Sequence, residues 1–192
     1  MTKPLLAAAL LCSFASAALA GVTSKTNYRY FTVHGSSPAS IYHAMTRDSS
    51  PVDDRRTIAN TEYSISSSAM KSKGSPCRVT GIDVNVTYDI HLPRLAGEGA
   101  LSPGERRDWR SFVAYLKGHE DHHRALWMAC VARYSSNLQS LIGTGCDNID
   151  ARMDARWSGP ERICRAENDN YSAYAMRLVQ AQPFMLRVRN GD

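Results

Sequence analysis

The chain has 192 residues, of which 43% are hydrophobic and 21% are charged, and its formal net charge is +5. This balance excludes a disordered tail and a collagen-like chain and is typical of one globular domain. The arginines are spread along the chain and interleaved with acids, so they do not form the basic stripe that follows a nucleic-acid backbone. We therefore expect no nucleic-acid partner.

The N-terminal segment is typical of a secretory signal peptide. A basic residue precedes an apolar run at residues 5–14, and the small residues Ala18 and Ala20 form a cleavage site. No later stretch approaches the roughly 20 apolar residues of a transmembrane helix, so we expect no stable membrane insertion. Residues 1–20 are thus predicted to be removed, leaving residues 21–192 as one periplasmic or secreted domain with a net charge of +4.

Hydrophobic patterns predict a small sheet in the first half of the mature chain. Three strands are expected from aromatic and β-branched content or from alternation, at residues 28–33, 57–65 and 82–90. A short helix should follow the first strand, because Ser37 can cap it and Pro38 suits its first position. Residues 48–56 are predicted to be a charged loop, and residues 66–76 a flexible connection.

Two long helices are predicted in the second half. A capping box at residues 102–105 opens a helix whose apolar stripe continues to Leu141. A second helical region is expected over residues 146–180, with an interruption at residues 158–160 that contain glycine and proline. The sequence therefore predicts an α+β fold, in which a small antiparallel sheet packs against a long-helix hairpin.

Four cysteines follow the signal peptide, and an even number favours two disulfides in an exported protein. They are Cys77, Cys130, Cys146 and Cys164. None belongs to a C-x-x-C pair of the kind that holds a structural zinc ion, and three disulfide pairings are possible. A hairpin that turns near residues 143–145 places Cys164 near Cys130 and leaves Cys77 for Cys146, so this is the pairing we predict.

The long helix carries the segment His119-Glu120-Asp121-His122-His123, which satisfies the metal-binding pattern H-E-x-x-H. Residues four apart lie on one helix face, so His119 and His123 can bind one zinc ion. Zinc lowers the pKa of a bound water, and Glu120 can take its proton and pass it to a leaving amine. The alternative is an accidental match in solvated or core histidines. However, both histidines are in register with the apolar stripe, so we expect them to point toward the sheet and to need polar partners there.

The sequence offers one candidate for a third protein ligand. Leu126 and Ala129 stand where a metzincin has glycine and histidine, which excludes that subclass. In the predicted hairpin, residues 163–172 pass the two histidines of the motif, and within them we select Glu167. The alternative is that Glu167 is an exposed helical acid.

The order of these features resembles a bacterial family of exported domains of unknown function, described as candidate zinc-dependent proteases. The resemblance covers about residues 28–182. It rests on the alternating strand that continues into Leu92-Pro93-Arg94-Leu95, followed by Trp109, the H-E-x-x-H motif, Cys146-Asp147 and Tyr171. It implies a zincin-like metallopeptidase that acts on a peptide or protein substrate, with His119 and His123 as zinc ligands and Glu120 as general base.

The last helix departs from the family's pattern. The family carries Tyr-Asp-x-x-Thr-x-His-Gly, whereas here Ser172 follows Tyr171 and Arg177 replaces the histidine. If that histidine is the family's third ligand, this chain uses another residue or binds metal weakly. The alternative function is therefore a catalytically inactive member of the same fold that acts as an envelope binding protein. A module for anionic polymers, based on net charge alone, ranks below both.

Overall fold

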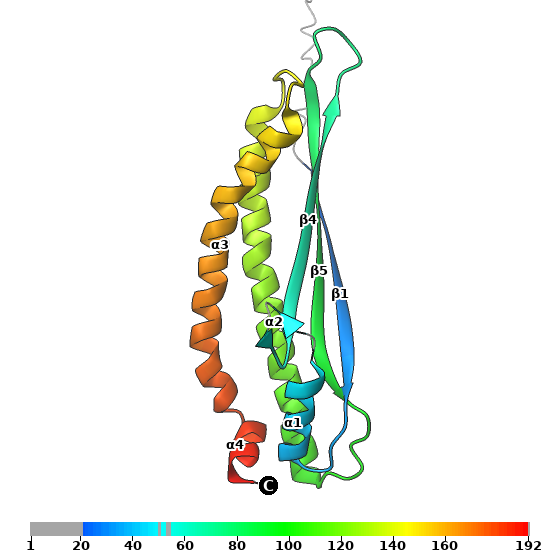
Figure 1. Cartoon of the computed structure of the whole chain (residues 1–192), viewed down its shortest axis with the longest axis vertical. Helices are drawn as coiled ribbons and strands as arrows, with labels where there is room; N and C mark the ends of the chain where they lie inside the picture. The colour runs from blue at the N-terminus through cyan, green and yellow to red at the C-terminus, as the bar shows by residue number, and fades with distance from the viewer. Residues whose placement is uncertain (1–20, 50, 53–54, 192) are drawn as a thin grey trace, which may run out of the picture.

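The computed structural model describes residues 21–49, 51–52 and 55–191. Figure 1 shows an elongated molecule in which a long sheet is covered by helix α2 (Pro103–Leu138), with helix α3 (Ile149–Gln180) running beside α2. The predicted signal peptide lies outside the described residues. None of the described helices combines the length and the apolar character needed to cross a membrane.

Three long strands form the sheet in the order β1-β5-β4. They are β1 (Gly21–Val33), β4 (Asn60–Lys71) and β5 (Val79–Leu95). The central strand β5 is antiparallel to β4 but parallel to β1, so the predicted antiparallel sheet is in fact mixed. The end of β1 and the start of β4 both lie beside the end of β5, so the chain reverses twice before β5 and then runs in the direction of β1.

The strands extend beyond the predicted segments. Residues 66–71, predicted to be a flexible connection, continue β4 and pair with β5. Their alternation of exposed and partly buried side chains is regular, but serines occupy both faces and conceal it in the sequence. The predicted charged loop contains a short antiparallel pair, β2 (Pro51–Val52) and β3 (Arg55–Arg56).

The helices begin where their caps predict. α1 (Pro38–Asp48) follows the Ser37 cap, and α2 follows Ser102, whose capping box with Glu105 is formed. A short 3-10 turn, η1 (Gln139–Leu141), extends α2 to the predicted end. With 36 residues α2 is about 54 Å long, and it therefore runs along most of the sheet.

The predicted interruption of the second helix is wrong. α3 continues through Pro160, and Figure 1 shows it as one curved ribbon; a shorter helix, α4 (Pro183–Asn190), follows it. A proline removes one helical hydrogen bond, a cost that tertiary packing can offset. Trp157 packs against the hydrophobic core on one side of Pro160, and Cys164 is fully buried on the other.

Two separate hydrophobic cores lie under α2. The α4-side core includes Ile41 of α1, Phe112 of α2 and Phe184 of α4. The turn-side core includes Val84 of β5 and Tyr134 of α2, and lies toward the α2–α3 turn. The mixed α+β class is confirmed. The H-E-x-x-H motif lies in the region between these two cores.

Two disulfides join the elements, and both match the predicted pairing. Cys77–Cys146 ties the start of β5 to the α2–α3 turn, and Cys130–Cys164 joins α2 to α3. The cysteines of the second bridge are fully buried in the turn-side core. This bridge therefore fixes the register of the two helices next to the H-E-x-x-H motif.

We expect each disulfide to contribute substantially to the stability of this domain. The bridges close loops of 69 and 34 residues, for which loop-closure entropy predicts a contribution of about 4 kcal/mol each to the free energy of unfolding. Cys130→Ala/Cys164→Ala should lower that free energy by about this amount, measured by urea unfolding. A loss below about 1 kcal/mol would contradict the assigned bridge; Cys77→Ala/Cys146→Ala is the matched comparison.

Candidate metal centre

The H-E-x-x-H motif lies near the middle of α2, between the two cores. Leu116 belongs to the α4-side core and Trp127 to the turn-side core, one turn before and after the motif. Between them Glu120 is only 3% exposed, and both histidines are partly buried. The apolar stripe of α2 is thus interrupted by a buried polar layer. The histidines turn toward α3, whereas we predicted that they would face the sheet.

The two histidine side chains converge through the same ring nitrogen. His119 Nε2 lies 3.1 Å from His123 Nε2, and the rings are nearly perpendicular. Two nitrogens that bind one zinc ion tetrahedrally at 2.0–2.1 Å are about 3.3 Å apart. The observed separation therefore fits a shared ion with little movement of either ring.

Both imidazoles are held in the neutral form that metal binding requires. Burial, reinforced by His123 and His122, lowers the pKa of His119 to about 4. Burial also lowers the pKa of His123, although its contact with Asn168 opposes that shift. At neutral pH neither ring carries a charge that would repel a cation.

Glu120 lies beside the histidine pair but faces the sheet. The Thr61 hydroxyl of β4 donates to Glu120 Oε2 at 2.8 Å, while Glu120 Oε1 is 4.0 Å from His119 Nε2. Burial raises the pKa of Glu120 to about 7, against the opposing effect of the Thr61 hydrogen bond. A carboxyl group with this pKa can accept and return a proton near neutral pH.

Three side chains of α3 complete the polar layer; the predicted hairpin placed their segment, residues 163–172, beside the histidines, but none of the three was selected. Asn168 Oδ1 lies 2.7 Å from His123 Nδ1, and Ser172 Oγ lies 3.3 Å from His123 Nε2. The Tyr171 ring packs on His119, His122 and His123, with centroids 4.1–5.0 Å away. A signal for Asn168 was available: it lies four residues after Cys164, and so shares the face that the predicted disulfide turns toward α2.

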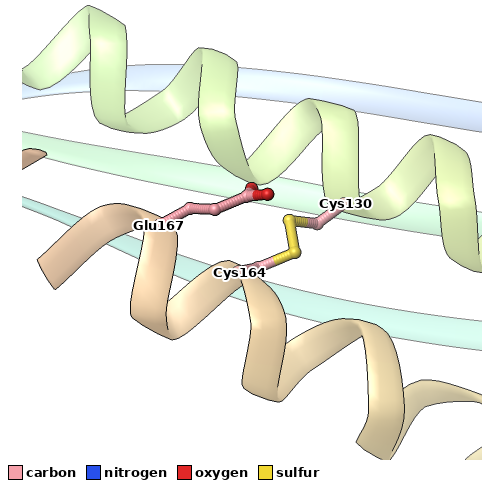
Figure 2. Close-up of side chains that lie close together, drawn as sticks. All are labelled: Cys130, Cys164 and Glu167. Carbon is pink, nitrogen blue, oxygen red and sulfur yellow. A yellow bond between two sulfur atoms is a disulfide. The ribbon is translucent and has the colours of Figure 1, made fainter. Parts of the chain in front are cut away.

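The structure does not bring Glu167 to the two histidines. Its carboxylate pairs with Arg133 at 2.8 Å and lies against the Cys130–Cys164 bridge, as Figure 2 shows. Within the described ranges, this is the one cluster of three or more cysteine, histidine or acidic side chains close enough to share an ion. Its sulfurs are bonded to each other, so they are not thiolate ligands.

Of the two departures from the family pattern, one lies beside the histidine pair and the other does not. Ser172, at the position of the family's aspartate, faces His123. Arg177, at the position of the family's histidine, is exposed and lies 5.9 Å from the Tyr174 ring. A longer acceptor at position 172 would therefore reach the histidine pair, which makes this position the natural place for a third donor.

Comparison with known proteins gives a family but no characterised relative. The model of DUF922, a bacterial protein family of unknown function, matches residues 28–177. No curated protein and no solved structure matches the chain significantly. The match covers nearly the same residues as the resemblance found in the sequence, and the zinc-protease description of that resemblance stays a prediction.

The buried carboxyl group of Glu120 predicts a specific pH dependence of stability. Its folded-state pKa of about 7 lies above the ordinary value of 4.5, so the folded protein binds an extra proton between these pH values. The resulting stabilisation is full below pH 4.5 and is lost as pH rises through 7. Relative to Glu120→Gln, the wild type should thus lose roughly 3 kcal/mol of unfolding free energy across this range.

The measurement is urea unfolding of both proteins from pH 4 to 8 in the presence of a chelator. The two histidines, whose lowered pKa values act in the opposite direction, are common to both proteins and cancel in the difference. A difference that does not change with pH would contradict the burial of an ionisable Glu120.

Proposed function

The chain belongs to the DUF922 family of bacterial proteins of unknown function, and we propose that it is a zinc-dependent metallopeptidase of the bacterial cell envelope. One observation carries this proposal. The Nε2 atoms of His119 and His123 converge at 3.1 Å beside the buried carboxyl group of Glu120. This combines a pair of neutral metal ligands with a proton acceptor in one turn of helix.

His119 and His123 would hold the ion through their Nε2 atoms. Imidazole nitrogens are good zinc ligands, and the two rings are kept neutral by burial. Tyr171 covers the rings from α3 and limits their contact with solvent. When bound, zinc supplies Lewis acidity, which lowers the pKa of a water and polarises a peptide carbonyl.

Glu120 would carry the proton. Its Oε2 is fixed by the Thr61 hydroxyl, and its Oε1, 4.0 Å from His119 Nε2, is left as the acceptor on the histidine side. Its pKa is about 7 in the metal-free protein, and a bound cation would favour the ionised form, which can take a proton from water and return it to the leaving amine. General acid–base catalysis of this kind contributes about 10²- to 10⁴-fold in rate.

The envelope location is supported by the cysteines and by the N-terminal sequence. All four cysteines after residue 20 are paired, which is typical of proteins that fold in an oxidising compartment. The apolar run and small-residue cleavage site at residues 1–20 provide the route of export. A substrate would then be an envelope peptide or protein.

A second candidate function is a non-catalytic envelope binding protein with the same fold. The specific observation in its favour is the donor set, because no third histidine, cysteine or acid joins His119 and His123 in the part of the chain that the structure describes. Ser172 supplies only a neutral hydroxyl at this point. A site with two protein ligands binds zinc more weakly than one with three.

Metal content tests the site itself. The purified mature chain should contain about one zinc per molecule after dialysis against zinc, measured by elemental mass spectrometry. His119→Ala and His123→Ala should each lose it, because neither can provide the paired nitrogens. His122→Ala is the matched control, since His122 is exposed and packs on the Tyr171 ring without joining the Nε2 pair, and it should keep the metal. A wild type without bound zinc would refute the metallopeptidase proposal.

Glu120→Gln separates the two candidate functions. The amide keeps the size of the side chain but cannot act as a base, so the variant should retain zinc and lose at least about 100-fold of wild-type cleavage of a fluorescently labelled casein. Zinc-loaded wild type that fails to cleave this substrate and a panel of unstructured peptides would favour the binding protein.

Ser172→Asp should strengthen zinc binding. Its carboxylate would extend from a position where the present hydroxyl is 3.3 Å from His123 Nε2, and so would add an anionic third ligand. We expect zinc affinity to rise by about tenfold or more, measured by competition with a fluorescent chelator. The matched control is Ser172→Asn, which has the same shape without the charge and should change affinity little. Equal affinities of the two variants would contradict the assigned geometry.

A further inference from the structure

We propose that Asn168 is a positioning residue that fixes the tautomer of His123 and keeps its Nε2 lone pair directed at the metal position. The inference rests on the proposed function for its purpose, but the ring geometry on which it depends can be measured without metal. Asn168 lies on α3, is only 7% exposed, and is one of the few buried polar side chains among the described residues.

Both ends of the Asn168 amide are engaged. Its Nδ2 donates to the backbone carbonyl of Cys164 at 2.8 Å, and its Oδ1 lies 2.7 Å from His123 Nδ1. A carbonyl oxygen can only accept a hydrogen bond, so the Cys164 carbonyl requires the amide nitrogen on its side. The orientation of the amide is therefore determined by the backbone and not by the histidine.

The amide orientation in turn determines the His123 tautomer. Since Asn168 presents an oxygen to His123 Nδ1, that nitrogen must carry the proton for a hydrogen bond to form at 2.7 Å. The neutral ring then has its lone pair on Nε2. This is the atom that faces His119 Nε2 and the Ser172 hydroxyl.

The environment of His119 is consistent with this assignment. If His123 Nε2 is an acceptor, the 3.1 Å contact between the rings requires His119 Nε2 to donate in the metal-free protein. The His119 Nδ1 atom is then without a proton. It is buried and has no hydrogen-bond partner among the described residues, as an unprotonated nitrogen can be. Among the described residues, His123 thus has a hydrogen-bond partner at Nδ1, and His119 has none there.

The position of Asn168 is set by a covalent link. Cys164, whose carbonyl holds the Asn168 amide, is bonded to Cys130 of α2, and His123 lies on α2 two turns before Cys130. A closed path therefore runs from α2 through the disulfide to Asn168 and back to α2 through His123. Partners that orient metal-binding histidines in this way typically change metal affinity by about 10- to 100-fold when removed.

The test begins with the metal-free mature protein, with its disulfides intact. Nitrogen-15 NMR of the imidazole rings should show His123 protonated on Nδ1 and His119 on Nε2. In Asn168→Ala, His123 should no longer be restricted to the Nδ1-protonated form. Asn170→Ala, an exposed asparagine on the same helix, is the matched control and should leave both rings unchanged.

Zinc affinity provides the second readout. Asn168→Ala should weaken zinc binding by about 10- to 100-fold while the circular dichroism spectrum is retained. Asn168→Asp keeps an acceptor for His123 Nδ1 but loses the donor to Cys164, so it should lose stability and yet bind zinc within a few-fold of wild type. If Asn168 only stabilised the fold, Asn168→Asp would lose zinc affinity together with stability.

The outcomes are distinguishable from those of the proposed function. The inference is overturned if His123 is protonated on Nε2 in the wild type, and this result does not depend on how well the variant folds. It is also overturned if the His123 tautomer is unchanged in Asn168→Ala. Both conclusions hold even if the protein binds zinc. The expected tautomers in a protein that takes up no zinc support the positioning by Asn168 and overturn the metallopeptidase.

Discussion

The structure depends on a buried polar layer that divides its interior. A single helix, α2, serves as the wall of two hydrophobic cores, and an uninterrupted apolar stripe would have joined them into one. Instead Glu120 and two histidines occupy the turn between the cores. Buried polar groups destabilise a fold unless each finds a partner, so the neighbouring elements must supply partners at this level. β4 supplies Thr61, and α3 supplies Asn168.

This requirement accounts for the way α3 is attached. A helix that only covered apolar side chains could slide by a fraction of a turn at small cost, but the 2.7 Å contact between Asn168 and His123 tolerates no such movement. The Cys130–Cys164 bridge lies one turn of α3 from this contact, and Arg133 and Glu167 form an ion pair beside it. The covalent bond therefore holds the two helices in the register that the polar layer needs.

Local features of the sequence predicted most of the elements, and non-local ones account for what was missed. The Ser102 capping box and the apolar stripe predicted α2, and hairpin register predicted both disulfides. The parallel pairing of β1 depends on which edge of β5 it joins, and no local pattern encodes that. Selection of Glu167 in place of Asn168 has a similar cause, because a shift of one residue rotates the position by about 100° around the helix.

The energetics of Glu120 bear on the choice between the two proposed functions. A binding surface gains nothing from a carboxyl group that is only 3% exposed, and an apolar side chain there would join the two cores. Burial makes ionisation of this carboxyl group near neutral pH costly, and the hydrogen bond from Thr61 offsets only part of that cost, so its pKa is raised to about 7. A nearby cation would remove much of that cost, since an opposite charge favours the ionised form. A metal on the paired histidines and a role in proton transfer would account for the buried glutamate, and this supports our proposal of a metallopeptidase over that of a binding protein.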